Sequence, residues 1–370
     1  MLAIQGDGTT TDAWTTPVSV VGLPEGNVTS ISVGDLHACA VIDGRSANGG
    51  SYANSTAWCW GYNANGQLGD GTTTDRSVAV KVKNLAPNVT SVYAGSGLDG
   101  AGFTCALLAG GSVKSWGNGA YGSRGDGSSV EAQSTPVSVQ GLENVVVTQL
   151  SLGYYFALAL TSDGEVYGWG KNDFYQLGDG TSTDRATAVE ASNIPDGYTV
   201  TSVSAGYRHA SFREADGGLA SWGEGSYGEF GNGASTSSGG SADLYFAAGY
   251  EDTLPPSAVP TAVPIPAPTA LPTPVPTTNM SRSTFGTSYA GAYTAHVVDD
   301  DGGIWYAGYC YQGRCGDGQE NSDSATNPVY DLTRIAGINN VAKLDQNTGT
   351  GIALTGGGAV WYVFVVQRRC

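Results

Sequence analysis

Short runs of apolar and β-branched residues, separated by glycine-rich polar turns, dominate the hydrophobic pattern of the chain. Residues 156–160 and 165–169 are two such runs, joined by Asp163-Gly164, where glycine accepts the positive φ of a hairpin turn. Runs at 188–190 and 199–204 predict two further strands. Four short antiparallel strands are the unit of a β-propeller blade, so we expect an all-β chain.

The same pattern returns at a regular interval. The glycine that follows a tryptophan stands at positions 61, 117, 170 and 223, a spacing of 53 to 56 residues. A period near fifty residues is typical of propellers. The sequence predicts a closed β-propeller of six four-stranded blades, or of seven if Ala248-Gly249-Tyr250 marks a decayed repeat.

The two ends of the chain share one repeat between them. Residues 6–12 carry the tail of the repeated motif, and residues 357–362 carry its beginning. We therefore expect the N- and C-terminal segments to close the last blade together, which removes the exposed strand edges of an open array.

One segment interrupts the ring. Nine of the fifteen prolines lie between Pro255 and Pro276, and proline cannot donate to a sheet ladder. We divide the chain into propeller blades at 1–250, a Pro-rich insertion at 251–284 that is polyproline II or disordered, and the remaining blades at 285–370.

Charge and hydropathy exclude some partners. The net charge is −17 and the sequence shows no cluster of Lys and Arg, whereas binding to a phosphate backbone needs one. The longest apolar run, residues 359–366, is too short to span a bilayer. We expect no nucleic-acid partner and no membrane insertion.

The first full repeat resembles the regulator of chromosome condensation repeat family. It reads Gly34-x-x-His37-x-Cys39-Ala40, a turn, and then a motif from Cys59 to Thr72 that includes Trp60-Gly61 and Gln67-Leu68-Gly69-Asp70-Gly71. The resemblance implies a propeller, usually of seven blades, that presents one face to a protein. Members include an exchange factor for the GTPase Ran, a plant ultraviolet-B photoreceptor, a secreted β-lactamase inhibitor and ubiquitin-ligase modules. The photoreceptor pattern has a tryptophan where this chain has Tyr207.

Most repeated residues are predicted to build blades. Four tryptophans at one repeat position are expected to pack between blades: Trp60, Trp116, Trp169 and Trp222. The three histidines fall in different blades, which is unsuited to a metal site. The Asp-Gly-Thr-x-Thr-Asp runs lack the alternation of a calcium loop, so we interpret them as turns capped by their own side chains. We expect no cofactor and no enzymatic activity.

Aromatic residues in the loops after each Trp-Gly are the candidate binding residues. The slot of Asn65 holds Tyr121, Phe174 and Tyr227 in later repeats, and Tyr62, Tyr175 and Tyr311 lie within a few places of it. All these loops should emerge on one side of the ring, because every repeat turns the same way. Either each ring covers its own blade, or the rings contact a protein or glycan partner.

Cysteines and glycosylation sequons suggest a compartment. Cys39 and Cys59 lie on the two strands of one hairpin, and Cys310 and Cys315 lie in one short loop, so we predict two disulfides, with buried free thiols as the alternative. Asn-x-Ser/Thr sequons begin at Asn27, Asn54, Asn88 and Asn279. Together with the Pro-rich tract, they predict an extracellular or cell-surface glycoprotein.

The sequence thus predicts a non-enzymatic binding or structural module that presents one propeller face to a protein or glycan partner. Assembly with other copies or into a filament stays open. The alternative is an intracellular, cytoplasmic propeller that regulates a GTPase in the manner of an exchange factor. A glycan-processing enzyme is the third reading.

Overall fold

The computed structural model of the chain describes residues 5–10, 18–43, 55–215, 218–226, 229–230, 240–246, 288–290, 294–298, 304–308, 329–334, 341–346, 350–355 and 360–365. Several predicted features lie outside these residues: the insertion at 251–284, Ala248-Gly249-Tyr250, Tyr227, Tyr311, Cys310, Cys315, Asn54 and Asn279.

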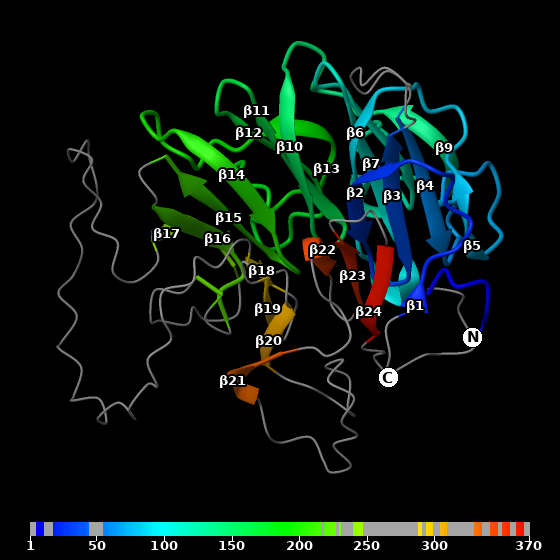
Figure 1. The fold of residues 1–370 in the computed structure, drawn as a ribbon. Helices are drawn as coiled ribbons and strands as arrows, with labels where there is room; N and C mark the ends of the chain where they lie inside the picture. Colours follow the sequence, from blue (N-terminus) through cyan, green and yellow to red (C-terminus); the bar gives the residue numbers. More distant parts are fainter. Residues whose placement is uncertain are drawn as a thin grey trace.

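The described strands form six four-stranded antiparallel sheets, which we number as blades one to six (Figure 1). Blade one contains β2 (Asn27–Val33), β3 (His37–Asp43), β4 (Thr56–Gly61) and β5 (Arg76–Lys81). Blade two contains β6 (Val89–Ala94), β7 (Phe103–Leu108), β8 (Val113–Gly117) and β9 (Gln133–Ser138). Blade three contains β10 (Val147–Leu152), β11 (Phe156–Thr161), β12 (Val166–Gly170) and β13 (Arg185–Glu190).

The other three blades follow the same order. Blade four contains β14 (Val200–Ala205), β15 (His209–Glu214), β16 (Leu219–Gly223) and β17 (Ser241–Phe246). Blade five contains β18 (Ser288–Ala290), β19 (Thr294–Val298), β20 (Ile304–Gly308) and β21 (Val329–Arg334). Blade six contains β22 (Val341–Gln346), β23 (Thr350–Thr355), β24 (Val360–Val365) and β1 (Val18–Ser19). Two short 3₁₀ turns, η1 (Leu98–Gly100) and η2 (Ala120–Gly122), lie in loops of blade two.

The two ends of the chain meet in blade six. Strand β1 pairs antiparallel with β24, with Val18 opposite Tyr362 and Ser19 opposite Trp361. The prediction that both termini complete the last blade is therefore confirmed. Strand β2 of blade one also contacts β22 and β23 of blade six. Between blades four and five lies a segment outside the described residues, so full closure of the ring stays a prediction.

The strand predicted at 199–204 belongs to a different blade from the one expected. It is β14, and it pairs with β15 in blade four rather than completing blade three. The first strands of neighbouring blades contact each other, β2 with β6 and β10 with β14, so each blade begins at the centre of the ring. The sequence indicates a strand after β13, but it does not show whether that strand pairs with the blade before it or with the blade after it.

Tryptophans join each blade to the one before it, as predicted. Trp116, Trp169 and Trp222 are fully buried, and each indole N–H donates to a carbonyl of the preceding blade. The acceptor of Trp116 is the Gln67 carbonyl oxygen, at 2.8 Å. Trp60 is also fully buried, and its ring lies against Gly6 of the N-terminal segment. The interfaces between blades therefore form the hydrophobic core.

The N-terminal segment reproduces the loop that precedes the fourth strand in complete repeats. The Gly8 N–H donates to the Ser77 carbonyl at 2.9 Å, as the Gly71 N–H donates to that of Ser134 at 2.9 Å. Residues 5–10 thus occupy, against blade one, the place that residues 68–73 occupy against blade two.

Candidate protein-binding face

In each antiparallel blade, the loop between strands one and two and the loop between strands three and four leave from the same end. Loops of both kinds from blades two to four carry large rings and two cations. We call this surface the aromatic face and define it by these residues: Leu98, Tyr121, Tyr154, Tyr155, Lys171, Phe174, Tyr207 and Arg208.

The tyrosines of the aromatic face form a continuous series of ring contacts. The ring centroids of Tyr121 and Tyr155 are 5.1 Å apart, and those of Tyr154 and Tyr155 are 4.9 Å apart, both in edge-to-face arrangement. The ring centroid of Tyr154 lies 4.3 Å from that of Tyr207 in the next blade. The Tyr155 hydroxyl accepts a hydrogen bond from the Leu98 N–H at 2.9 Å. These contacts fix the loops of three blades relative to one another.

Two cations extend this series. The Lys171 ammonium lies 5.0 Å from the ring centroid of Tyr121 and 5.8 Å from that of Tyr154. It also pairs with Asp173 at 3.0 Å. In the same way, the Arg208 guanidinium lies 4.5 Å from the ring centroid of Phe174 and 5.1 Å from that of Tyr207. Glu224 is its carboxylate partner, at 3.7 Å. The face therefore combines cation–π contacts with ion pairs across blades three and four.

The aromatic face has a buried base and an open top. Tyr154 and Tyr155 are buried, whereas 46% of Tyr121 and 62% of Leu98 is exposed. Burial, with smaller contributions from Tyr207 and Asp35, raises the pKa of the Tyr154 hydroxyl above its usual value. Burial also raises the pKa of Tyr155. Both hydroxyls therefore stay protonated and available as hydrogen-bond donors.

Left-handed backbone conformations concentrate on this side of the ring. Asp99, Tyr121, Tyr155 and Tyr175 have φ between 52° and 63°. Such values are uncommon for residues other than glycine and cluster at functional sites. At the repeat position of Tyr175, blade two has Gly122, where an added Cβ would lie 2.5 Å from the Ala186 backbone. A side chain at this position therefore has to be accommodated by the neighbouring strand.

The structure places four of the six predicted aromatic residues. Tyr121 and Phe174 belong to the aromatic face, joined through Tyr155, Tyr154, Tyr207 and Arg208. Tyr62 lies against Gly100, and Tyr175 is half-buried. Their contact with a partner stays a prediction. The exposed ring of Tyr121 contacts the next blade, which differs from the alternative in which each ring covers its own blade.

Sequence reasoning missed the central part of the face. Tyr154, Tyr155, Tyr207 and Arg208 lie in the loops between the first and second strands, whereas the predicted binding residues all lie in the loops between the third and fourth strands. The available signal was the replacement of Asp35-Leu36 by Tyr154-Tyr155 in an otherwise conserved Gly-x-x-His/Phe frame of the repeat.

The Asp-Gly-Thr runs have the predicted turn chemistry. One oxygen of Asp70 accepts from the Thr72 N–H at 2.9 Å and from its hydroxyl at 2.6 Å, and the other pairs with Arg76 at 2.8 Å. Asp179, Thr181 and Arg185 repeat this arrangement in blade three. Burial acts to raise the pKa of Asp70, but hydrogen bonds from Thr72 and Arg76 hold it below its usual value. The carboxylate is thus ionised and engaged in the turn.

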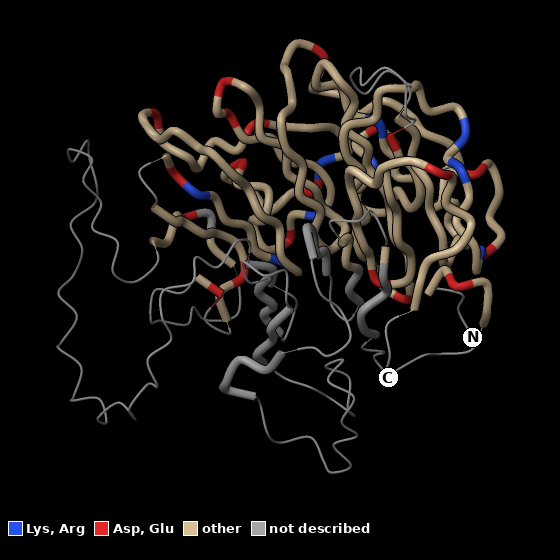
Figure 2. Tube along the Cα trace, in the orientation of Figure 1, with Lys and Arg blue, Asp and Glu red and all other residues tan. Residues whose placement is uncertain are grey.

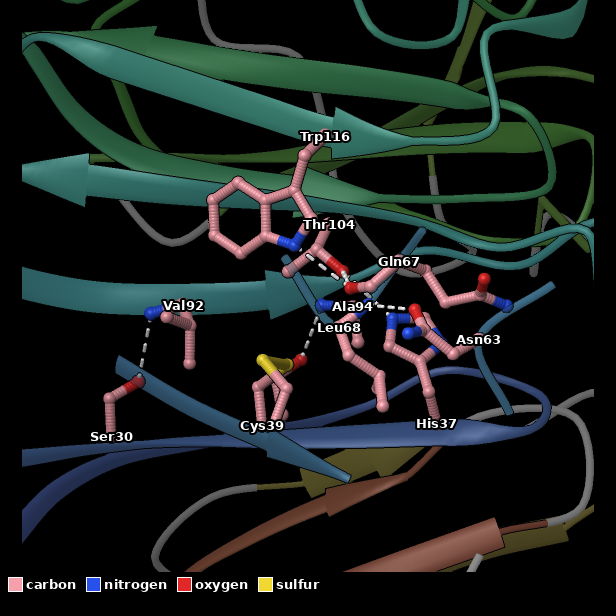
Figure 3. Close-up of a disulfide and its surroundings, with 12 residues drawn as sticks. Ser30, His37, Cys39, Asn63, Gln67, Leu68, Val92, Ala94, Thr104 and Trp116 are labelled. Atoms are coloured by element: carbon pink, nitrogen blue, oxygen red, sulfur yellow. Dashed lines mark hydrogen bonds between the residues drawn. A yellow bond between two sulfur atoms is a disulfide. The ribbon is translucent and has the colours of Figure 1, made fainter. Parts of the chain in front are cut away.

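The buried histidine of blade one links two blades (Figure 3). The Thr104 hydroxyl donates to the Gln67 carbonyl at 2.8 Å, so the Nε2–H of His37 is the donor in the 2.9 Å bond to Thr104. Burial lowers the pKa of His37 to about 3. In the part of the chain that the structure describes, no group of three His, Cys, Asp or Glu side chains could hold a metal ion.

The cysteines of blade one are bonded to each other. Cys39 and Cys59 lie opposite each other on β3 and β4, form a disulfide, and are fully buried (Figure 3). Cys105 is a buried free thiol whose pKa burial raises to about 12. Of the described sequons, Asn27 is exposed, whereas Asn88 is half-buried and its carbonyl accepts from the Ala109 N–H.

Three stretches of the chain, 54–107, 110–160 and 163–212, match the model of the regulator of chromosome condensation (RCC1) repeat. A second model of this repeat matches residues 147–176. Residues 54–212 therefore carry repeats of the regulator of chromosome condensation family. The resemblance predicted from the motif between Gly34 and Thr72 is thereby confirmed, as is the propeller class of the fold.

Relatives of known sequence match about half of this chain. Ultraviolet-B receptor UVR8 of Arabidopsis thaliana is 34% identical over 176 residues, which is 48% of this chain and 39% of the receptor. E3 ubiquitin-protein ligase HERC2 of Homo sapiens is 32% identical over 50% of this chain and 4% of the ligase. The mitochondrial RCC1 domain-containing protein RUG3 of Arabidopsis thaliana is 28% identical over 56% of this chain and 44% of that protein.

Solved structures share the fold at low sequence identity. Prp20p from Saccharomyces cerevisiae, described with its binding to Gsp1p and histones, has a TM-score of 0.55 at 18% identity. The alignment covers 90% of this chain and 72% of Prp20p. Human WBSCR16 has a TM-score of 0.55 at 16% identity, over 94% of this chain and 89% of that structure. At these identities the likeness shows the fold alone.

The predicted extracellular or cell-surface setting is wrong, and with it the main functional prediction of an extracellular glycoprotein module. UVR8 and the mitochondrial protein RUG3 are intracellular. Sequons arise by chance in a chain rich in Asn, Ser and Thr, so they carried less weight than the prediction gave them. The disulfide does not decide the compartment, because two fully buried sulfurs are shielded from thiol exchange. A glycan partner has no support from the relatives.

Proposed function

We propose that this chain is a non-enzymatic propeller that works inside the cell and docks a protein partner through the aromatic face. The observation that carries the proposal is the series of rings and cations across blades two to four, with 46% of Tyr121 exposed at its top. Tyrosine and arginine are, with tryptophan, the residues enriched in binding hot spots. A rigid base under an exposed ring also reduces the entropy that is lost on binding.

Internal contacts support a docking role for these side chains over a catalytic one. Lys171 and Arg208 are held by carboxylates and by ring faces, and Tyr154 and Tyr155 stay protonated. A general acid or base needs a pKa near the working pH. Charges held in ion pairs and rings fixed by their neighbours instead provide a preformed surface.

A small GTPase is the partner class that we favour. Family resemblance implies one face presented to a protein, with exchange of nucleotide on a GTPase as one activity in the family. Prp20p, which shares the fold, is described with its binding to Gsp1p and histones. The test is release of a fluorescent nucleotide from Ran-class and Ras-class GTPases with and without the full chain. Unchanged release rates for all of them would rule out exchange activity on these GTPases.

The docking proposal itself is tested by comparing partners of matched variants. The double variant Tyr121→Ser/Phe174→Ala changes the aromatic face, and Val146→Ala/Leu219→Ala changes exposed apolar residues elsewhere. Each full-length protein is used to recover partners from its native source, after circular dichroism has verified its fold. We expect the first variant to lose at least 90% of a partner that the control retains, about 1.4 kcal/mol or more. Equal recovery by both variants would show that the partner binds elsewhere.

A further inference from the structure

The open part of the aromatic face places apolar surface between carboxylates. Leu98 is 62% exposed, and the neighbouring Asp99 is also exposed. The Asp173 side chain is 45% accessible and pairs with Lys171, which lies over the Tyr121 ring. Tyr155 connects Tyr121 to the loop of Leu98, since it contacts the Tyr121 ring and accepts from the Leu98 N–H. This composition suits a ligand that carries positive charge on an apolar or planar side chain.

The rings of the face already bind cations of the chain itself. Lys171 lies over Tyr121, and Arg208 lies between Phe174 and Tyr207. These contacts show that π faces here are oriented for cations. Because Tyr121 remains 46% exposed beside Lys171, part of its ring is open to a second cation from outside. An arginine guanidinium can stack on a tyrosine and bind a carboxylate at the same time.

Charges around the face are predominantly acidic. Burial and the charge of Asp173 raise the pKa of Asp184. Burial raises the pKa of Glu224 as well, and the charges of Glu229 and Asp173 add to this effect, while Arg208 opposes it. Burial is the largest cause in both groups, and the smaller contributions of Asp173 and Glu229 show that other carboxylates lie nearby. A further negative charge would be disfavoured at this place, and an added positive charge would be stabilised.

The acidity of the whole chain acts in the same direction. The net charge is −17, and Asp and Glu recur along the loops of the described residues, whereas Lys and Arg are sparse (Figure 2). A field of one sign raises the association rate of a partner with the opposite charge and suppresses partners of like charge. The complementary partner surface is therefore basic.

We propose that the aromatic face binds a basic segment of its protein partner, with an arginine side chain stacked on the open part of Tyr121 and paired with Asp99 or Asp173. This proposal rests on the docking function of the face and adds the chemistry of what docks there. The segment supplies positive charge from an extended or helical stretch, and Leu98 contacts its apolar atoms.

The test measures direct binding of a defined probe to the full-length protein. A short fluorescein-labelled peptide of alternating arginine and glycine is titrated by fluorescence anisotropy, next to a peptide with glutamate in place of arginine. We expect the basic peptide to bind and the acidic one not to bind. Asp99→Asn/Asp173→Asn should weaken binding of the basic peptide about tenfold, and Tyr121→Ser about fivefold. Asparagine tolerates the positive φ of Asp99, so the backbone is preserved.

A matched control separates this site from general attraction to an acidic protein. Asp163→Asn/Asp196→Asn removes the same charge from exposed residues at the opposite end of blade three and should change the Kd less than twofold. Equal losses in both double variants, or none in Asp99→Asn/Asp173→Asn, would overturn the proposal. Self-association that Tyr121→Ser abolishes would do so too, by assigning the face to a second copy. If the wild-type protein does not bind the basic peptide but Tyr121→Ser loses native partners, the docking function stands and the basic segment is excluded.

Discussion

The fully buried His37 should make the stability of the propeller depend on pH. Its ring lies against Gly34 and Gly102, and its Nε2–H donates to Thr104 across the boundary between blades one and two. Burial lowers the pKa of this histidine to about 3 in the folded state, against an ordinary value of 6.5. At equivalent positions blades two and three carry Phe103 and Phe156, so His37→Phe fits the packing and removes the titrating group.

The magnitude follows from the two pKa values. Because the folded pKa is lower, the unfolded chain binds the proton first as the pH falls, and the free energy of unfolding decreases below pH 6.5. Each pH unit between 6.5 and the folded value costs about 1.4 kcal/mol. From pH 7 to pH 5 the contribution of His37 is therefore about 2 kcal/mol of lost stability. His209, whose pKa burial also lowers, adds to the total in both proteins.

The assay is urea unfolding of wild type and His37→Phe at pH 7 and pH 5, at constant ionic strength, followed by tryptophan fluorescence. We expect the variant to lose about 2 kcal/mol less than wild type between the two pH values. At pH 7 the free energy of unfolding of the variant should differ from that of wild type by about 1 kcal/mol, the value of the lost His37–Thr104 hydrogen bond. Thr104 keeps its own bond to the Gln67 carbonyl. The same pH dependence in both proteins would refute a buried, neutral His37.

Two further predictions concern positions where one repeat departs from the others. Gln5 is buried at a position where complete repeats have a leucine such as Leu68. Among the described residues, neither polar atom of its side-chain amide has a hydrogen-bond partner. We therefore expect Gln5→Leu to stabilise the fold by about 1 to 2 kcal/mol. An unchanged or lower Tm would contradict this. Cys105 faces Ser115 in the register that joins the two disulfide cysteines of blade one. Ser115→Cys should therefore form a bridge worth up to about 2.7 kcal/mol, and alkylation of Cys105 after unfolding without reductant would show that it had not formed.

The architecture could be predicted because the residues that form it are repeated. Trp60, Gly61 and Gly69 recur at the same positions in the next three repeats, and the buried tryptophans join neighbouring blades. Trp116, for example, donates to the carbonyl of Gln67 in the blade before it. A single sequence thus contains several copies of the same evidence for the fold. The pairing of β1 with β24 followed in the same way, from two partial motifs that complement each other.

The aromatic face was harder to predict because its residues are the ones that change between repeats. Tyr154, Tyr155 and Tyr207 stand at positions where blade one has Asp35 and Leu36, and no repeated pattern indicates that their rings meet. Their rings meet across loops of different blades, and Tyr121 and Tyr155 have a left-handed backbone where they meet. Local sequence carries little information on such conformations outside glycine.

The compartment was predicted wrongly for a related reason. Asn27 and Asn88 each begin an Asn-x-Thr tripeptide, which was interpreted as a glycosylation sequon. Such tripeptides also occur by chance in loops rich in Ser and Thr, so they do not indicate a compartment. The buried Cys39–Cys59 disulfide stabilises blade one in any compartment where it forms, so it gives information on the fold and does not identify the compartment.

Conserved and variable positions of the repeat therefore serve separate purposes in one loop. In the loop after Trp169, the Asn172 side chain donates a hydrogen bond to Asp179 and stabilises the turn. Leu177 is fully buried at the blade interface, and the backbone carbonyl of Gln176 accepts from the indole N–H of Trp222. Lys171 precedes Asn172, and Phe174 lies between Asn172 and Gln176; both take part in the aromatic face instead. Because the turn is fixed by its own hydrogen bonds, the side chains between can change without loss of the blade. This division lets a propeller keep its fold while its face acquires the charge and shape of a particular partner.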